Sequence, residues 1–194
     1  MTANDPDAAL MLRVKDGDRG AFRELVERHQ RMVISTIGRA IGDAWEAEDL
    51  AQRVFVQVYR SAHRYQPTAQ FTTWLFAIVH NVILNEHRRR ARHRVQSLEA
   101  LQQPEDADAP GGMAIADTRA DSPAQAAVDR ELQAQIQAAI QELPPPQRTA
   151  VILCRFEGLA YEEIAQVLGC SVPAVKSLLH RARVSLKEKL RGYY

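Results

Sequence analysis

The sequence contains few residues that could cross-link the chain or hold it in a membrane. Two cysteines stand among its 194 residues. Because two isolated thiols do not make a disulfide framework, we expect a protein of a reducing compartment. No apolar run is long enough to cross a bilayer, and no secretory leader is evident at the start of the sequence. These absences predict a soluble, cytoplasmic protein.

Motifs of metal centres and of nucleophilic enzymes are also missing. The sequence has no HExxH, no CxxC and no nucleophile motif. His80 and His87 share one face of a predicted helix, but without a carboxylate partner we expect them to be exposed to solvent. The other candidate ligands are scattered, at His29, His63, His93, Cys154 and Cys170. We therefore expect no metal, no cofactor and no catalytic residue.

Charge is distributed unevenly along the chain, although the net charge is only +1. Five arginines crowd residues 88–94 without an acid among them, and the last helix is basic again from Lys176 onward. Between them, residues 96–123 carry six acids against Arg119 alone. Two basic segments separated by an acidic connector predict two contacts with a polyanion.

Apolar residues recur with the period of a helix along most of the chain, and strand-like alternation is scarce. We therefore predict an all-α fold with two small helical domains, at residues 1–95 and 124–194. Residues 96–123, rich in proline, glycine and acids, predict a flexible acidic linker. The predicted helices cover about 5–16, 18–42, 43–61, 125–142 and 147–156. A further helix is capped by Thr72 or Thr73 and runs into the arginines, and two more follow residue 156.

The last two helices form a predicted helix-turn-helix. Residues 164–168 have a helical apolar face, Gly169 can end that helix in the left-handed conformation, and Ser171 and Pro173 are typical of the start of the next. A second helix in this setting enters the major groove of DNA. An ordinary hairpin with a solvated basic face is the alternative. The candidate DNA contacts are Ser171, Lys176, Ser177, His180, Arg181 and Arg183.

Five segments carry motifs in a fixed order. They are GDRGAF at residues 17–22, EDLAQRVF at 48–55, FTTWLFAIVHN at 71–81 with the arginines after it, LPPPQR at 143–148 and FEGLAYEEIA at 156–165. In order and spacing they resemble the sigma factors of bacterial RNA polymerase, specifically the small two-domain extracytoplasmic function (ECF) group of the sigma-70 family. The resemblance covers almost the whole chain.

The resemblance implies that the first domain reads and melts the −10 promoter element and that the second reads the −35 element. Aromatic rings beside cations can hold unstacked bases, and an asparagine amide can bond a base edge. The loop at 66–70 would hold a flipped base, while the spacing of Trp74 favours a place in the core. The residues implied at the −10 element are Phe71, Trp74, Asn81, Asn85, Arg88, Arg89 and Arg90.

The resemblance also implies a polymerase-binding face on the third helix. Asp49 and Gln52, with Arg53 and Phe55 beside them, would meet a coiled coil on the β and β′ subunits of the polymerase core. Three positions depart from the family pattern: Arg53 stands where glutamate is frequent, and Ala77 and Leu178 stand where arginine is frequent.

Family members are usually held inactive by an anti-sigma factor, often anchored in a membrane, so we expect such a partner and a monomer when the protein is free. The competing hypothesis is an autonomous helix-turn-helix regulator that needs no polymerase. It accounts for the second domain but leaves the Asp49 face and the arginine-rich helix without a role. Such regulators usually dimerise, and no dimer seam is evident in the sequence.

Overall fold

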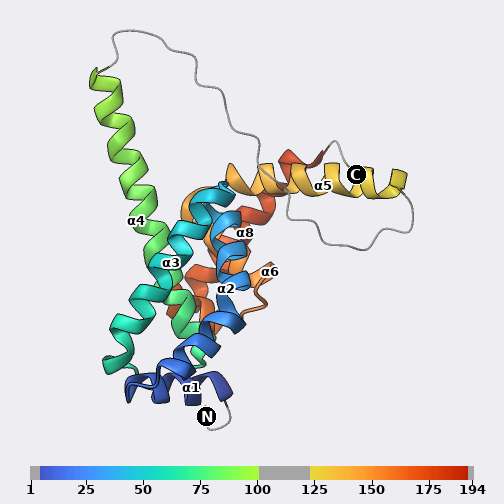
Figure 1. The fold of residues 1–194 in the computed structure, drawn as a ribbon. Helices are drawn as coiled ribbons and strands as arrows, with labels where there is room; N and C mark the ends of the chain where they lie inside the picture. The colour runs from blue at the N-terminus through green and yellow to red at the C-terminus, as the bar shows by residue number, and fades with distance from the viewer. Residues whose placement is uncertain (1–4, 101–122, 192–194) are drawn as a thin grey trace.

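The computed structural model describes residues 5–100 and 123–191 of the chain (Figure 1). These ranges contain helices and no strand, which confirms the predicted all-α fold class. None of the helices in them is both long and apolar enough to span a lipid bilayer. The elements are α1 (Pro6–Lys15), α2 (Arg19–Ile41), α3 (Ala44–Ser61), the 3-10 turn η1 (Ala62–Arg64), α4 (Phe71–Ala100), α5 (Pro123–Gln141), α6 (Pro145–Arg155), α7 (Tyr161–Leu168) and α8 (Val172–Lys189).

Aspartate side chains begin the first three helices. Asp5, Asp18 and Asp43 have extended backbones, and their carboxylates accept hydrogen bonds from backbone N–H groups of the first turn. These N–H groups have no partner within the helix, so the aspartates satisfy donors that would otherwise be exposed. The predicted helices at 18–42 and 43–61 start at two of these aspartates, and the structure confirms both starts.

Both ends of α4 differ from the prediction. The helix begins at Phe71, whose N–H donates to Oδ2 of Asp5 at 2.7 Å, and not at a threonine cap. The hydroxyl of Thr73 donates instead to Glu163 of α7. At its other end α4 continues to Ala100, past residue 96 where the linker was expected to begin. The rest of that predicted linker, residues 101–122, lies outside the described residues.

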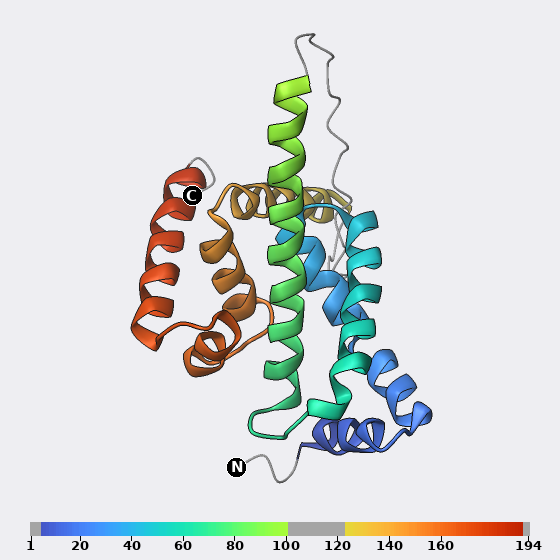
Figure 2. The ribbon, with the colours of Figure 1, turned by 90° about the vertical axis from the view of Figure 1, so that its left-hand side faces the viewer.

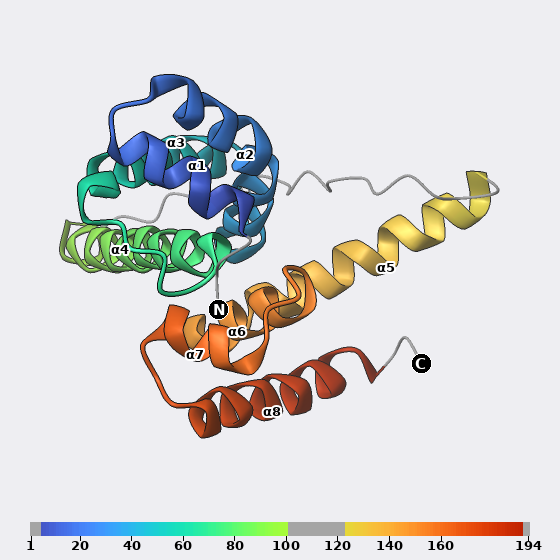
Figure 3. The same ribbon diagram turned by 90° about the horizontal axis from the view of Figure 1, so that it is seen from below.

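α4 is the central element of the molecule (Figure 2). It packs against α2 and α3 on one side and against α7 on the other. Helices α6 and α7 lie between the N-terminal helices and α8, so that α8 is on the outside of the molecule (Figure 3). A single buried apolar cluster extends from α1 through α8. The two predicted domains are therefore in contact with each other in this structure.

An aromatic cluster closes the end of the N-terminal bundle. The ring of Phe71 lies 5.8 Å from Trp74, 6.3 Å from Tyr65 and 5.2 Å from His29, measured between ring centroids. Phe71 is 1% exposed, whereas Trp74 is half-buried at the edge of the cluster. The ring of Phe71 therefore serves the core, and we leave it out of the contacts proposed below for the −10 element.

Polar side chains join the two halves of the chain around this core. The hydroxyl of Thr36 lies 2.6 Å from Oε1 of Glu157, and the guanidinium of Arg39 lies 4.5 Å from the centre of the Phe156 ring. Burial raises the pKa of the Glu157 carboxyl, although Thr36 and Arg39 act in the opposite direction. The ionised Glu157 carboxylate is therefore less favourable in the folded protein than the protonated form.

Replacing Phe71 by alanine is expected to destabilise the whole protein. Removing a buried phenylalanine side chain costs about 3–5 kcal/mol of unfolding free energy, because the cavity is only partly refilled. Asn81→Ala on the exposed face of the same helix is the matched control and should change stability by no more than about 0.5 kcal/mol. Urea unfolding measures both, and an F71A protein as stable as the unsubstituted one would contradict the core assignment.

Glu157→Gln is expected to stabilise the protein at pH 7. A carboxyl whose pKa is raised by folding favours the folded state only while it is protonated, and this contribution is lost as the pH rises through the folded-state pKa. Glutamine keeps an oxygen near Thr36 without the charge, so the gain should disappear at acidic pH. Urea unfolding over a pH series, with exposed Glu131→Gln as control, tests this. A lower stability of E157Q at pH 7 would refute it.

Candidate functional site

The helix-turn-helix has the local geometry that the sequence predicted. Gly169 ends α7 with a φ of 62°, in the left-handed region that glycine adopts readily. The Ser171 hydroxyl then accepts the N–H of Ala174 at 3.4 Å, and a proline occupies the first turn of α8. At the start of α7, the Glu163 carboxylate accepts the N–H of Ala160 at 2.9 Å. Gly169 and Ser171 thus form the turn between α7 and α8, while Glu163 caps the start of α7.

One face of α8 is buried and the opposite face is polar and exposed. Val175, Leu179 and Ala182 point into the core. Leu178, at a position where the family often has arginine, is half-buried against the same core. It therefore packs as an apolar residue and offers no charge to DNA. The predicted contacts to the −35 element are all exposed: Ser171, Lys176, Ser177, His180, Arg181 and Arg183.

α4 presents two different faces. Asn81, Asn85 and Arg88 are exposed and follow one another at helical spacing, so they form one outward strip. Thr73 points to α7 instead, and Ala77 is half-buried. The predicted −10 strip therefore stays exposed while the adjacent face of the helix holds the C-terminal half.

His80 and His87 were expected to be exposed, and the structure corrects this: both are half-buried. Burial lowers the pKa of His80, and burial together with the charges of Arg148 and Arg90 lowers that of His87. Each imidazole is therefore held in its neutral form more strongly than a free histidine. Within the described part of the chain, no three His, Cys, Asp or Glu side chains are grouped so that they could hold a metal ion.

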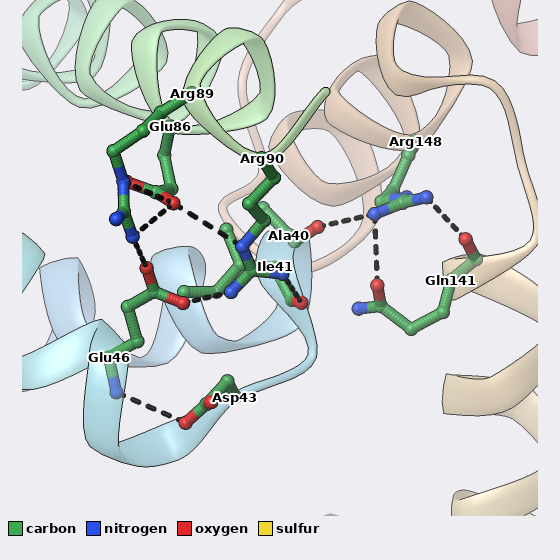
Figure 4. A network of polar contacts seen from close by, with 9 residues as sticks. All are labelled: Ala40, Ile41, Asp43, Glu46, Glu86, Arg89, Arg90, Gln141 and Arg148. Carbon is green, nitrogen blue, oxygen red and sulfur yellow. Dashed lines mark hydrogen bonds and ion pairs between the residues drawn. The ribbon is translucent and has the colours of Figure 1, made fainter. Parts of the chain in front are cut away.

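Two of the predicted phosphate-binding arginines already have carboxylate partners (Figure 4). Arg89 pairs with Glu86 on its own helix and with Glu46 in the first turn of α3, and Arg90 pairs with the same two acids. The Glu86 side chain is only 1% exposed. Its pKa is nevertheless lowered, chiefly because the Arg89 guanidinium donates hydrogen bonds to it. The pairing with Glu46 could not be predicted from the sequence, because this residue comes from a helix far from the arginines in the chain.

Two of the predicted polymerase-binding residues, Gln52 and Phe55, line an apolar groove between α2 and α3. Asp49, Gln52 and Arg53 are exposed, and Phe55 is 9% exposed at the groove wall. The other apolar residues that line the groove are Phe22, Val26 and Ile34 from α2 and Ala51, Val56 and Tyr59 from α3.

Sequence reasoning missed Trp45 in the first turn of α3. The side chain is 86% exposed. It precedes Asp49 by four residues, which places both on one face of the helix. The signal that could have found it was present: a tryptophan on the polar face of an amphipathic helix, in line with Asp49 and Gln52.

Both helical regions of the chain match families of known proteins. Family models match at residues 25–93, described as sigma-70 region 2, and at residues 133–186, described as sigma-70 region 4. The RNA polymerase sigma-H factor of Pseudomonas aeruginosa is 36% identical over 191 residues, which are 98% of this chain and 97% of that protein. The ECF RNA polymerase sigma-E factor of Escherichia coli K12 is 31% identical over 189 residues, covering 95% and 94% of the two chains.

A solved structure has the same fold. The sigma factor RpoE of Bartonella quintana, in complex with the anti-sigma factor NepR, aligns with a TM-score of 0.65 and 24% identity over 88% of this chain and 96% of that one. The long matches to whole sigma factors, together with the two sigma-70 regions in their expected order, establish the family. This chain belongs to the extracytoplasmic function group of the sigma-70 family of RNA polymerase sigma factors.

Proposed function

We propose that this sigma factor binds the RNA polymerase core through α3, reads the −35 element with α8 and captures the −10 element with α4. The observation that carries the proposal is the simultaneous exposure of two polar faces, on α8 and on the outward strip of α4, in the two regions that match the family. Its role is to direct the polymerase, and the polymerase core synthesises the RNA. We assign no cofactor and no catalytic residue to the chain.

At the −35 element, the N-terminal half of α8 enters the major groove. Lys176, Ser177 and His180 then face base edges, while Arg181 and Arg183 meet phosphates. This assignment is supported by the exposure of all five side chains on a helix whose opposite face packs into the core. Contacts to phosphate fix the register of the helix, and contacts to base edges select the sequence.

At the −10 element, Asn81 and Asn85 bond the edges of unpaired bases, and Arg88 holds the phosphate chain beside them. The loop at 66–70 lies directly before α4, and Trp74 at the start of that helix is half-buried, with its ring centroid 4.9 Å from that of Tyr65. A single strand that runs along α4 can reach these residues. Arg89 and Arg90 join them only after a change described in the next subsection.

For the polymerase, α3 offers a face of mixed character. Trp45, Asp49 and Gln52 follow one another along the helix, and the apolar groove lies beside Gln52. Exposed tryptophans are frequent anchors at protein interfaces, since one side chain buries a large area at a small cost in entropy. We assign this face, with Arg53 and Phe55, to the coiled coil of the β and β′ subunits.

The relative RpoE of B. quintana was solved with an anti-sigma factor. By extension, we propose that an anti-sigma factor with a membrane anchor binds this protein in the cell. We further propose that the free sigma factor is a cytoplasmic monomer. Such a partner would cover the polymerase-binding face, the DNA-binding faces or both.

Transcription from a promoter library tests the function directly. Purified core polymerase is assayed with and without this protein, and specific transcripts should appear only when both are present. The aligned start sites then give the −35 and −10 preferences. If the core gains nothing while the protein alone shifts specific duplexes in a gel, the autonomous regulator replaces the sigma factor.

Arg181→Ala is expected to weaken promoter binding and to flatten its dependence on salt. Each phosphate contact in duplex DNA contributes about 0.9 to the magnitude of the slope of log K against log salt. Loss of one contact should therefore reduce that magnitude by about 0.9. The exposed Arg31→Ala of α2 removes the same charge away from α8 and is the control. Holoenzyme binding over a salt series measures both, and an unchanged slope and affinity in R181A would remove the phosphate assignment.

Trp45→Ala is expected to weaken binding to the polymerase core. Loss of an aromatic anchor costs about 2 kcal/mol, which is roughly a thirtyfold rise in Kd. The exposed Gln57→Ala on another face of α3 should bind as the unsubstituted protein does. Competition against a labelled sigma factor for core polymerase gives the affinities, and equal Kd values for the two variants would exclude Trp45 from the interface.

A further inference from the structure

The network around Arg89 and Arg90 divides each guanidinium between two carboxylates. The Glu86 carboxylate lies 2.8 Å from both Nε and Nη2 of Arg89, and 3.3 Å from Nε of Arg90. Glu46 takes the Nη2 side, at 2.9 Å from Arg89 and in direct contact with Arg90. Figure 4 shows Glu46 reaching up from α3 to both arginines. Two cations and two anions therefore balance at this point.

Only one of the two carboxylates can be exchanged. Glu86 is on the same helix as the arginines, and its side chain is 1% exposed, so no external anion can take its place. Glu46 belongs to another helix and is 22% exposed, and the Arg89 side chain that it holds is 51% exposed. Arg90 stays in position through its bond to the carbonyl of Ile41 at 3.3 Å. An anion from solution can therefore approach the Nη2 groups from the side that Glu46 now occupies.

We propose that Glu46 occupies the place of a DNA phosphate, and that binding of the −10 strand exchanges this carboxylate for a phosphate on Arg89 and Arg90. The inference rests on the proposed contact between α4 and DNA. A phosphate diester carries the same single negative charge as the carboxylate, and two guanidinium Nη groups suit its oxygens. Glu86 remains behind as a positioning residue that keeps both guanidinium groups oriented.

The exchange gives the arginines of α4 different roles. Arg88 forms no ion pair with any residue that the structure describes, so it attracts DNA at all times. Arg89 and Arg90 contribute only after Glu46 has been displaced, and this displacement lowers the net gain from their phosphate contact. Because Glu46 lies in the first turn of α3, next to Trp45, the strength of DNA binding by α4 depends on a residue at the edge of the proposed polymerase-binding face.

Glu46→Gln tests the exchange. The full-length chain is titrated against a fluorescein-labelled single strand of randomised sequence over a series of salt concentrations, with fluorescence anisotropy as the readout. Freed arginines should raise the affinity about fivefold at low salt, the equivalent of one modest ion pair. The salt slope of E46Q should not differ from that of the control below, because both proteins make the same phosphate contacts once the strand is bound. Adding Arg89→Gln to E46Q should remove most of this gain.

Glu27→Gln on α2 is the matched control, because it removes the same charge from an exposed site. Thermal unfolding of each variant monitors the fold, and a loosened fold would not raise the affinity. If E46Q raises the affinity no more than E27Q does, the exchange is overturned. Failure of both E46Q and the unsubstituted chain to bind any single strand would overturn it as well. The proposed function is tested separately, by transcription. If the protein directs transcription but E46Q and E27Q bind the single strand with equal affinity, the exchange is refuted and the proposed function stands.

Discussion

The carbonyl groups at the C-terminal end of α2 hold the two halves of the molecule together. The last carbonyls of a helix have no partner within it, and they carry the negative end of its dipole. Here Arg148 of α6 donates to Ala40 at 2.6 Å, Gln137 of α5 donates to Arg39 at 3.1 Å, and Gln141 donates to that same carbonyl. Arg90 of α4 donates to Ile41. Three helices are thus tied to one helix end.

The same end depends on a glycine. Gly42 follows α2 with a φ of 77°, and a side-chain carbon at this position would lie 3.1 Å from the amide carbon of Gln141. Any other residue there would strain the turn and would push Gln141 away from the carbonyl that it reaches. Arg148 adds bonds to Gln141 and to the carbonyl of Leu143 at 3.1 Å, so one half-buried arginine holds the turn between α5 and α6 as well.

Local chemistry made much of this fold predictable. An aspartate or serine before an apolar period, and a glycine after one, locate helix ends by satisfying backbone groups within a few residues, so α2, α3 and the helix-turn-helix followed from the sequence. The start of α4 did not, because its first N–H is satisfied by Asp5, which is 66 residues away. A pattern of neighbours cannot contain such a partner.

The sites divide in the same way. Helical spacing placed Asn81, Asn85 and the outward residues of α8 correctly on exposed faces. Spacing alone did not separate a buried aromatic from an exposed one. Phe71 was therefore expected at the −10 element, whereas its ring lies in the core. Nor could it pair Glu46 with Arg89, since that contact exists only once α3 and α4 lie side by side. The arginine cluster therefore looked freer in the sequence than it is in the fold.

The division of α4 into two faces also bears on how such a factor can diverge. The side that holds the C-terminal half is anchored at Thr73, whereas Asn81 and Asn85 project from another side and support no part of the fold. Substitutions on the outward strip therefore leave the packing of the molecule unchanged. A duplicated copy of this protein can acquire a new promoter preference there without first having to regain stability, and the two functions of the helix evolve independently along a single element.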